Sequence, residues 1–362
     1  MKLLFITQKV DKDDGVLGVY HRWIEELARR FDKVSVICLY QGRTDLPANV
    51  SVYSLGKEKL EIRNWKFGIW KRLIYVVKFY RLIWGLRREY DAVFVHMNPE
   101  YVILGGIFWR LAGKKIILWY AHYLANWRIR LAAKLANRLV TSIGRAFPFP
   151  SRKLVILQQG IDTEKFKSIE SKVENEKFRV LFLGRISSVK NLDVLLRAFQ
   201  LASPHSEIEL SVVGGPTPGK NSEAVYFEQI KKMAGDLNIA SKVKFYAPVP
   251  NFQAPVIYNQ HDLFVNLTVT GSFDKSTLEA MSCGLPILVS NLAFKEILPK
   301  ELRDRLMFPE KDYLVLASKI KALANLSEDE RHKIGVTLRE LVIAKHGLDD
   351  LMDKLQQAIF SA

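Results

Sequence analysis

The sequence predicts an α/β protein with two Rossmann-like domains, each a parallel β-sheet flanked by helices. The chain has 362 residues, which is too long for one comfortable core and suits two domains of roughly 150–200 residues. In both halves, short apolar runs alternate with helical patterns, as in a sheet covered on both faces. The polar stretch 165–177 separates the two series and indicates a linker.

In the first half, we expect strands at 3–7, 34–40, 92–96, 115–120, 138–142 and 154–158. The helical patterns between them cover residues 18–31, 65–88, 101–112 and 129–136. The corresponding domain is residues 1–165, which we expect to hold the acceptor or face a membrane.

In the second half, we expect strands at 179–183, 208–213, 243–246, 263–266 and 286–290. Helices are predicted at 192–201, 226–234, 275–282 and 294–298, followed by an all-helical tail at 314–326, 328–343 and 348–360. The second domain is therefore residues 166–345, and residues 346–362 form a C-terminal helix that can cross back to the first domain. Two such sheets with facing loop edges would form one cleft, where ligands commonly bind.

Composition favours a cytoplasmic protein. The two cysteines, Cys38 and Cys283, both lie in apolar runs, which is typical of small buried side chains and not of a disulfide framework. The opening run 2–6 is too short for a secretory signal, and no apolar run reaches the length of about 18 residues that a bilayer span requires.

The net charge of +16 belongs to the first half of the chain. Residues 1–165 carry 29 Lys and Arg against 14 Asp and Glu, whereas residues 166–362 carry 25 against 24. This asymmetry indicates an anionic partner for the first half: a membrane surface, a nucleic acid or a phosphorylated acceptor.

Two loops of the second half have residues suited to a diphosphate. Gly184 ends an apolar strand, and Arg185 and Lys190 then place two cations beside the start of a helix. The alternative is that both are solvated loop charges. The pair Gly214-Gly215 follows the next strand and permits close backbone approach, although such glycines are common.

The most informative segment is residues 270–286. A glycine-containing loop enters a helix whose free N–H groups, around residues 275–278, can receive a phosphate. Glu279, about one turn into this helix, can accept hydrogen bonds from ribose hydroxyls. The alternative, a buried helix with one glutamate, accounts poorly for a carboxylate within Leu-Glu-Ala-Met.

These three segments, in this order, resemble the retaining GT-B glycosyltransferases of family four, the glycosyl transferases group 1. The second domain of that family has a Gly-Arg…Lys-Asn/Gly turn, a Gly-Gly turn and a helix reading Leu-Glu-Ala-Met-Ala-Cys-Gly-x-Pro-Val. In the first half, Gly18 before a helix is similar to the glycine-rich loop of the family. Ala121-His122 and the turn 159–162 are similar to its early histidine and its Asn-Gly-Val-Asp turn.

The resemblance implies the GT-B fold and a nucleoside-diphosphate-sugar donor on the second domain. The implied catalytic residues are His122, Arg185 and Lys190. Cations and helix N–H groups would stabilise the departing diphosphate while the acceptor attacks from the same face, with retention. The implied donor-binding residues are Gly18, Gly184, Arg185, Lys190, Gly214, Gly215, Pro250, Gly271, Ser272, Phe273, Asp274, Lys275, Ser276, Thr277 and Glu279. Neither a metal nor a cofactor is expected.

One position departs from the family pattern. The family has two glutamates separated by seven residues, and Glu279 corresponds to the second, but Gly271 stands at the position of the first. Because that first glutamate helps to hold the donor sugar, its loss leaves the sugar identity open. Asp274 or Lys275 could substitute for it, and an inactive homologue is the alternative.

Residues 63–90 form a basic, aromatic segment with eight Lys or Arg and one acid, Glu89. A stripe at helical spacing includes Leu73, Val76, Tyr80 and Ile83. Trp and Tyr beside Lys and Arg are typical of a helix that lies at a membrane interface. The alternative is a core-packed helix with solvated charges. We therefore expect a protein on the cytoplasmic membrane face with a lipid-linked or anionic glycan acceptor.

Two other classes of function fit less well. A nucleic-acid-binding protein agrees with the sequence pI of about 9.6, but no helix-turn-helix, zinc-finger or RNA-binding strand motif is present. A dinucleotide-dependent oxidoreductase would share the fold class, yet neither half has Gly-x-Gly-x-x-Gly after its first strand.

Overall fold

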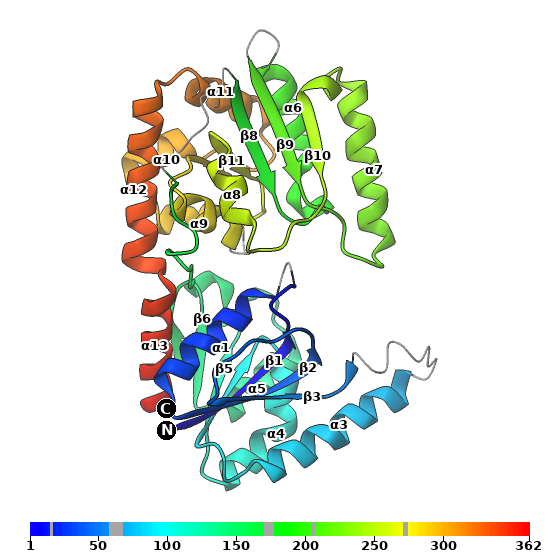
Figure 1. Ribbon diagram of the computed structural model, residues 1–362, viewed down its shortest axis with the longest axis vertical. Coiled ribbons are helices and arrows are strands. Elements are labelled where there is room, and N and C mark those ends of the chain that lie inside the picture. Colours follow the sequence, from blue (N-terminus) through cyan, green and yellow to red (C-terminus); the bar gives the residue numbers. More distant parts are fainter. Residues whose placement is uncertain (15–16, 58–67, 170–176, 204–206, 271–273) are drawn as a thin grey trace. The chain divides into compact units, whose positions relative to one another are not determined.

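The computed structural model describes residues 1–14, 17–57, 68–169, 177–203, 207–270 and 274–362. The chain divides into two compact units (Figure 1). Unit 1 comprises Met1–Gly160 and Leu348–Ala362, and unit 2 comprises Ile161–Gly347. Each unit has its own parallel sheet with helices on both sides, so the predicted α/β class is confirmed.

The unit boundaries differ slightly from the expected positions at 165 and 345. Ile161 already belongs to unit 2, because its N–H donates to the carbonyl of His346 over 2.8 Å and it forms a β-bridge with Gly347. The last helix, α13 (Leu348–Phe360), belongs to unit 1, where it packs on α1 (Val19–Arg30). Arg30 on α1 fixes this contact through an ion pair of 2.8 Å with Asp353.

Unit 1 contains a seven-stranded sheet in the order β3-β2-β1-β4-β5-β6-β7, with every pair parallel. The strands are β1 (Lys2–Val10), β2 (Lys33–Gln41), β3 (Val50–Ser54), β4 (Ala92–His96), β5 (Lys115–Trp119), β6 (Arg138–Thr141) and β7 (Leu154–Ile156). The edge strand β3 was not predicted. It is only half buried, and Ser51 and Ser54 interrupt its apolar residues.

Helices cover both faces of this sheet because side chains alternate along each buried strand. Phe5 and Phe94 point toward α1 and α13, whereas Ile6 and Val95 point into the core formed with the other three helices. Those helices are α3 (Gly68–Gly85), α4 (Pro99–Leu111) and α5 (Trp127–Leu135).

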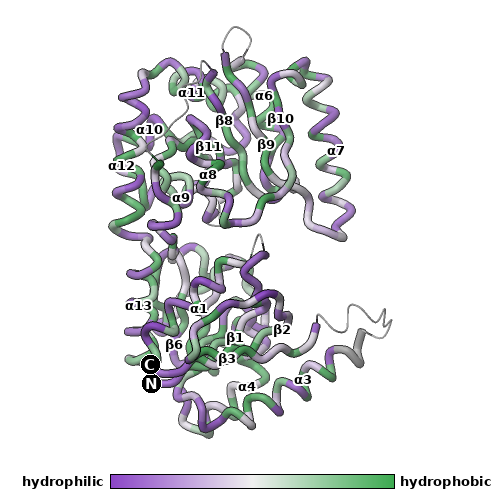
Figure 2. The backbone as a smooth tube through the Cα atoms, viewed as in Figure 1, coloured by the Kyte–Doolittle hydropathy of each residue, from purple (hydrophilic) through white to green (hydrophobic). Residues whose placement is uncertain are grey.

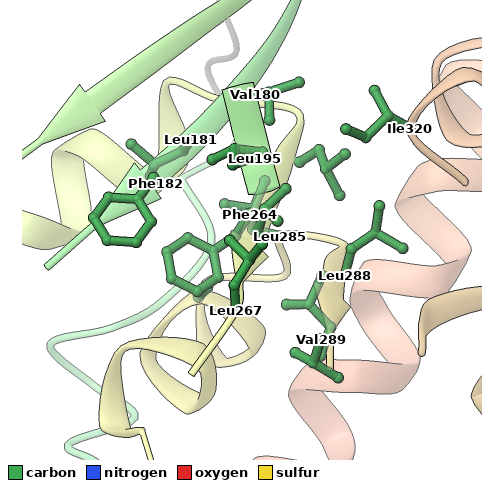
Figure 3. Close-up of a cluster of buried hydrophobic side chains, with 14 of the residues drawn as sticks. Val180, Leu181, Phe182, Leu195, Phe264, Leu267, Leu285, Leu288, Val289 and Ile320 are labelled. Carbon is green, nitrogen blue, oxygen red and sulfur yellow. The ribbon is translucent and has the colours of Figure 1, made fainter. Parts of the chain in front are cut away.

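Unit 2 contains a five-stranded parallel sheet in the order β10-β9-β8-β11-β12. The strands are β8 (Phe178–Leu183), β9 (Ile208–Val213), β10 (Val243–Tyr246), β11 (Leu263–Asn266) and β12 (Ile287–Val289). Its core is continuous, and Figure 3 shows Phe264, Leu285 and Leu288 near Leu195 and Ile320. Strand β8 is the middle strand in this order. The loops after β8, β9 and β11 lie at the same edge of the sheet, where the parallel strands end.

The helices of unit 2 largely follow the predicted pattern. They are α6 (Leu192–Ala202), α7 (Asn221–Asp236), α8 (Ala254–Asn259), α9 (Lys275–Ser282), α10 (Lys300–Leu306), α11 (Tyr313–Ala324) and α12 (Glu328–His346). The short helices α8 and α10 were not predicted. The helix expected at 294–298 is instead a 3₁₀ turn, Leu292–Glu296, capped by the Asn291 side chain.

Helix α12 lies close against the turn after α9. A Cβ on Gly335 would lie 1.9 Å from the carbonyl oxygen of Gly284, so this position admits only glycine without displacement of the backbone. We expect Gly335→Ala to destabilise unit 2 by about 3 kcal/mol and to lower its unfolding midpoint by roughly 6–12 °C. The control is Gly235→Ala in α7, which meets nothing within 4 Å and should raise stability slightly. Equal midpoints for wild type and Gly335→Ala would contradict this close approach.

Within the described residues, every helix is too short or too polar to span a bilayer.

Candidate functional site

The candidate residues of unit 2 gather at the carboxyl edge of its sheet. Gly184 and Arg185 follow β8, Gly214 and Gly215 follow β9, and the loop after β11 leads into α9. Parallel strands bring such loops together, so residues far apart in the sequence meet at one edge. Three of the predicted donor-binding residues, Gly271, Ser272 and Phe273, lie outside the described residues.

The glycines at this edge let two loops touch backbone to backbone. Gly184 and Gly214 adopt φ values of +155° and +145°, which favour glycine. A Cβ on Gly214 would lie 1.9 Å from the carbonyl oxygen of Gly184, and one on Gly215 would lie 2.9 Å from Cγ of Pro248. The close contact between these loops therefore requires glycine at these positions.

Lys190 and Asp274 form an ion pair at the start of α9. The Lys190 ammonium also donates to Oγ1 of Thr268 over 2.9 Å, and Thr268 donates to Asp274 over 2.8 Å. Asp274 caps α9 by accepting from the Ser276 backbone N–H over 3.2 Å and from the Ser276 hydroxyl over 2.7 Å. Both carboxylate oxygens of Asp274 are thus engaged within the site.

This pairing keeps Asp274 ionised. Burial alone would raise the pKa of the Asp274 carboxyl, but the Lys190 charge and the hydrogen bonds from Lys190 and Ser276 outweigh it and hold that pKa below its usual range. Lys275, the first residue of α9, is affected differently, because burial lowers its pKa to about 8 while the charge of Glu279 opposes the shift. Thr277 lies fully buried on the same helix.

Arg185 is the more accessible of the two predicted diphosphate cations. Its side chain is 48% exposed, and its Nε lies 3.9 Å from Oε1 of Glu223. Glu223 accepts from the Thr217 backbone N–H over 2.9 Å and from the Lys220 ammonium over 3.0 Å. Burial would raise the pKa of Glu223, but these hydrogen bonds outweigh it and lower the value to about 2. The Arg185 guanidinium therefore has an ionised partner and an exposed face.

Glu279 lies buried one turn into α9, with a donor on each carboxylate oxygen. Tyr258 of α8 donates to Oε2 over 3.2 Å, and the amide of Asn251 donates to Oε1 over 3.3 Å. Asn251 in turn accepts from the Lys165 ammonium over 2.6 Å. Burial raises the pKa of the Glu279 carboxyl.

Three residues of this hydrogen-bond network were not predicted from the sequence. Asn251 lies next to the predicted Pro250, and Tyr258 lies on the unpredicted helix α8. Lys165 is the first residue of the stretch taken as a linker.

The two remaining candidates belong to unit 1. Gly18 precedes α1, and a Cβ there would lie 2.4 Å from the carbonyl oxygen of Asp14. His122 follows β5, where its Nδ1 accepts from the Leu124 backbone N–H over 3.1 Å and its ring stacks on Tyr123 at 4.9 Å. Both lie in loops that follow strand carboxyl ends. Among the described residues of both units, no group of three or more His, Cys, Asp or Glu side chains could hold a metal ion.

Comparison with known families shows that several of these site residues lie within one family match. A family model described as glycosyl transferases group 1 matches residues 162–340, which include Arg185, Lys190, Asp274 and Glu279. Residues 162–340 of this chain belong to the glycosyl transferases group 1. With two parallel sheets flanked by helices, the chain has the GT-B fold that the resemblance implied.

Curated relatives that this chain matches include the D-inositol 3-phosphate glycosyltransferase of Rhodococcus opacus. The two are 33% identical over 116 residues, which are 31% of this chain and 25% of that relative. The match thus spans about a quarter of that relative's length.

Solved structures similar to this chain cover nearly all of it at low identity. Anabaena HepE in complex with UDP and glucose matches with a TM-score of 0.77 and 17% identity, covering all of both chains. Sucrose-phosphate synthase from Thermosynechococcus elongatus matches with a TM-score of 0.78 and 16% identity, covering 99% of this chain and 98% of that one. At this identity, the likeness establishes the fold.

Proposed function

We propose that this protein is a retaining glycosyltransferase that moves a hexosyl or N-acetylhexosaminyl group from a nucleoside-diphosphate-sugar, such as a UDP-sugar, to an acceptor. The observation that carries the proposal is the convergence of Lys190, the start of α9 and Glu279 at one sheet edge, inside the segment that matches the family. Similar structures with UDP support the same class of donor.

Each residue has a role in this proposal. The exposed Arg185 guanidinium, Lys190 and the free N–H groups of α9 would bind the diphosphate and stabilise its charge as the glycosidic bond breaks. Glu279 would accept from ribose hydroxyls, and His122 of unit 1 would position donor and acceptor. Because these cations supply the positive charge, we expect neither a metal nor a cofactor.

The decisive experiment measures binding and hydrolysis of UDP-, GDP- and ADP-sugars by the wild-type chain, with and without anionic lipid vesicles. Selective binding of one donor is expected, and it would name the base. If no donor binds under any condition, the transferase proposal fails, and the basic unit 1 becomes the surface to study for nucleic-acid or other anion binding.

We expect Glu279→Ala to weaken binding of the selected donor by roughly 10- to 100-fold, because two charge-assisted hydrogen bonds to ribose would be lost. Isothermal titration calorimetry measures the change. Glu279→Gln keeps the shape of the side chain and one acceptor oxygen, so donor affinity should fall less in this variant. If Glu279→Ala and wild type bind the donor with equal affinity, Glu279 does not bind the ribose.

Unit 1 also exposes a large apolar surface on α3, α4, α5 and the loop before α5. We call it the three-helix face. Its exposed large hydrophobic residues are Leu73, Ile74, Val77, Tyr80, Trp84, Ile107, Leu111, Tyr123, Leu124, Trp127 and Leu131. Exposed apolar side chains gathered on neighbouring helices favour an interaction site, since scattered single residues are the norm on a monomer.

The three helices form one layer. The Tyr80 hydroxyl donates to the carbonyl of Leu104 over 2.9 Å, and Trp84 packs on Phe108 at 5.7 Å, which ties α3 to α4. Arg110 of α4 donates to the carbonyl of Lys134 in α5 over 3.2 Å. Figure 2 shows hydrophobic and hydrophilic positions mixed along α3. Such mixing suits a helix with one side in the core and the other in a lipid headgroup layer.

Charge favours an anionic membrane as the partner of the three-helix face. The same layer carries Arg72, Arg81, Arg87, Arg110, Arg128, Arg130 and Lys134. Residues 101–150 contain no acid at all. We therefore propose peripheral binding to the cytoplasmic membrane face and a lipid-linked or other anionic acceptor. Vesicle binding that weakens as salt rises supports this proposal.

A further inference from the structure

A chain of hydrogen bonds runs from the start of unit 2 to the ribose-binding candidate. The Lys165 ammonium donates to Oδ1 of Asn251 over 2.6 Å, and Nδ2 of Asn251 donates to Oε1 of Glu279 over 3.3 Å. Tyr258 donates to the other oxygen of Glu279 over 3.2 Å. All four residues of this hydrogen-bond network lie in unit 2.

The chemistry of the two ends fixes the orientation of the Asn251 amide. A lysine ammonium only donates, and a carboxylate only accepts. The amide oxygen must therefore face Lys165, and the amide NH₂ must face Glu279. A flipped amide would oppose donor to donor and acceptor to acceptor. Lys165 thus fixes the orientation of the Asn251 amide, so that the NH₂ group of that amide faces Glu279.

Lys165 is held in place by its own segment. Its backbone N–H donates to Asp162 over 3.0 Å, and the carbonyl of the next residue, Phe166, accepts from Ser282 over 2.5 Å and from Arg339 over 2.9 Å. Residues 161–169 are therefore fastened to α9 and α12, and they are no free linker. The Phe166 ring also packs on Tyr258 at 6.2 Å, which joins both branches of the network.

We infer that Lys165, Asn251 and Tyr258 are positioning residues that aim Glu279 at the two hydroxyls of a ribose and so select ribonucleotide over 2′-deoxyribonucleotide donors. This inference rests on the proposed nucleotide-sugar function and adds a specificity network to it. A carboxylate has about four acceptor positions, and Asn251 and Tyr258 occupy two of them. Counted over the described residues, two positions remain for a vicinal diol.

The test compares the nucleoside diphosphate that wild type binds best among UDP, GDP and ADP with its 2′-deoxy counterpart by calorimetry. We expect wild type to prefer the ribonucleotide by about tenfold. In Lys165→Met and Asn251→Leu this ratio should fall to about two- or threefold, and Tyr258→Phe should lower it less. Lys165→Arg keeps a cationic donor and should recover much of the preference.

The matched control is Lys167→Met, which removes an exposed ammonium from the same segment and should leave the ratio unchanged. A pH series adds a readout that loss of structure would not mimic. Ribonucleotide binding needs ionised Glu279, which Lys165, Lys275, Asn251 and Tyr258 face from four segments, with the Cys283 thiol nearby. Without Lys165 the pKa of Glu279 rises, so affinity should begin to fall at a higher pH than in wild type.

The outcomes distinguish failure of this inference from failure of the proposed function. If wild type binds none of the three diphosphates, the proposed function fails and the network has no ligand to select. If wild type binds one of them and Lys165→Met and Asn251→Leu keep its ribose preference, this inference is overturned while the proposed function stands. Should one variant fail to fold, the other and Tyr258→Phe carry the same comparison.

Discussion

Replacing Lys190 by alanine is expected to lower kcat for sugar transfer by about 10³-fold or more. The ammonium of Lys190 would be lost where the diphosphate develops charge, and such preorganised charge is usually the largest contribution to catalysis. The loss would be aggravated by Asp274, because its carboxylate would remain in the site and repel the diphosphate. Initial rates at saturating donor, for the donor chosen by the binding panel, measure the effect.

A double variant separates catalysis from folding. Removal of Lys190 alone leaves a mostly buried carboxylate without its cation, which costs about 3–5 kcal/mol in such pairs. Lys190→Ala with Asp274→Asn removes both charges, so thermal stability should largely return while transfer stays low. If the double variant also recovers activity to within tenfold of wild type, Lys190 serves only to neutralise Asp274.

The strands were predictable wherever the sheet buries them on both faces. Ala92–His96 and Leu263–Asn266 are apolar runs that end in a polar residue, and the structure places the fully buried strands β4 and β11 there. The edge strand Val50–Ser54 escaped prediction because one side of an edge strand contacts no neighbour, and its sequence need not be apolar throughout. The short helices α8 and α10 have too few residues for a 3.6-residue period to stand out.

The site was predictable only in its local parts. Arg185, Lys190 and Glu279 each lie in a motif that a few adjacent residues define, so their sequence neighbourhood marks them. Asn251 and Tyr258 meet Glu279, and Lys165 meets Asn251, through tertiary contacts between residues that lie 21 to 86 positions apart in the sequence. No local spacing encodes such a contact, because it depends on how the strands are ordered in the sheet.

Asp274 illustrates the same limit. The sequence offered it as a substitute for the glutamate that Gly271 replaces, since both are acidic and lie three residues apart. In the structure its carboxylate pairs with Lys190 and caps α9. Whether it also meets a donor sugar stays a prediction, but any such contact must compete with the Lys190 charge.

The basic segment was interpreted from a stripe that included Leu73, Tyr80 and Ile83. In the structure, α3 instead buries Phe79 and Ile83 and leaves Leu73 and Tyr80 exposed. The exposed surface continues onto α4 and α5, which the sequence did not indicate, because helix amphipathicity reports one helix at a time. The three-helix face is therefore a property of the packed layer.

Changing three of its residues to glutamate should nearly abolish membrane binding. Trp84, Leu111 and Trp127 are 60%, 86% and 65% exposed and lie on α3, on α4 and at the start of α5. Each large apolar side chain contributes roughly 1.5–3 kcal/mol when buried, and each new carboxylate is repelled by anionic lipid. We expect the triple variant to bind phosphatidylglycerol-containing vesicles at least about 100-fold more weakly at low salt, as measured by co-sedimentation.

The control must add the same charge elsewhere. Val225, Leu314 and Ile343 are exposed apolar residues on α7, α11 and α12 of unit 2, so their replacement by glutamate changes the net charge equally. If the three-helix face binds the membrane, this variant loses only the long-range attraction, whereas the first also loses apolar insertion. Equal losses in both variants would mean that binding depends on net charge and no face is privileged. Donor hydrolysis in the absence of vesicles should be unchanged in the first triple variant, because none of its three positions lies in unit 2, which carries the proposed donor site.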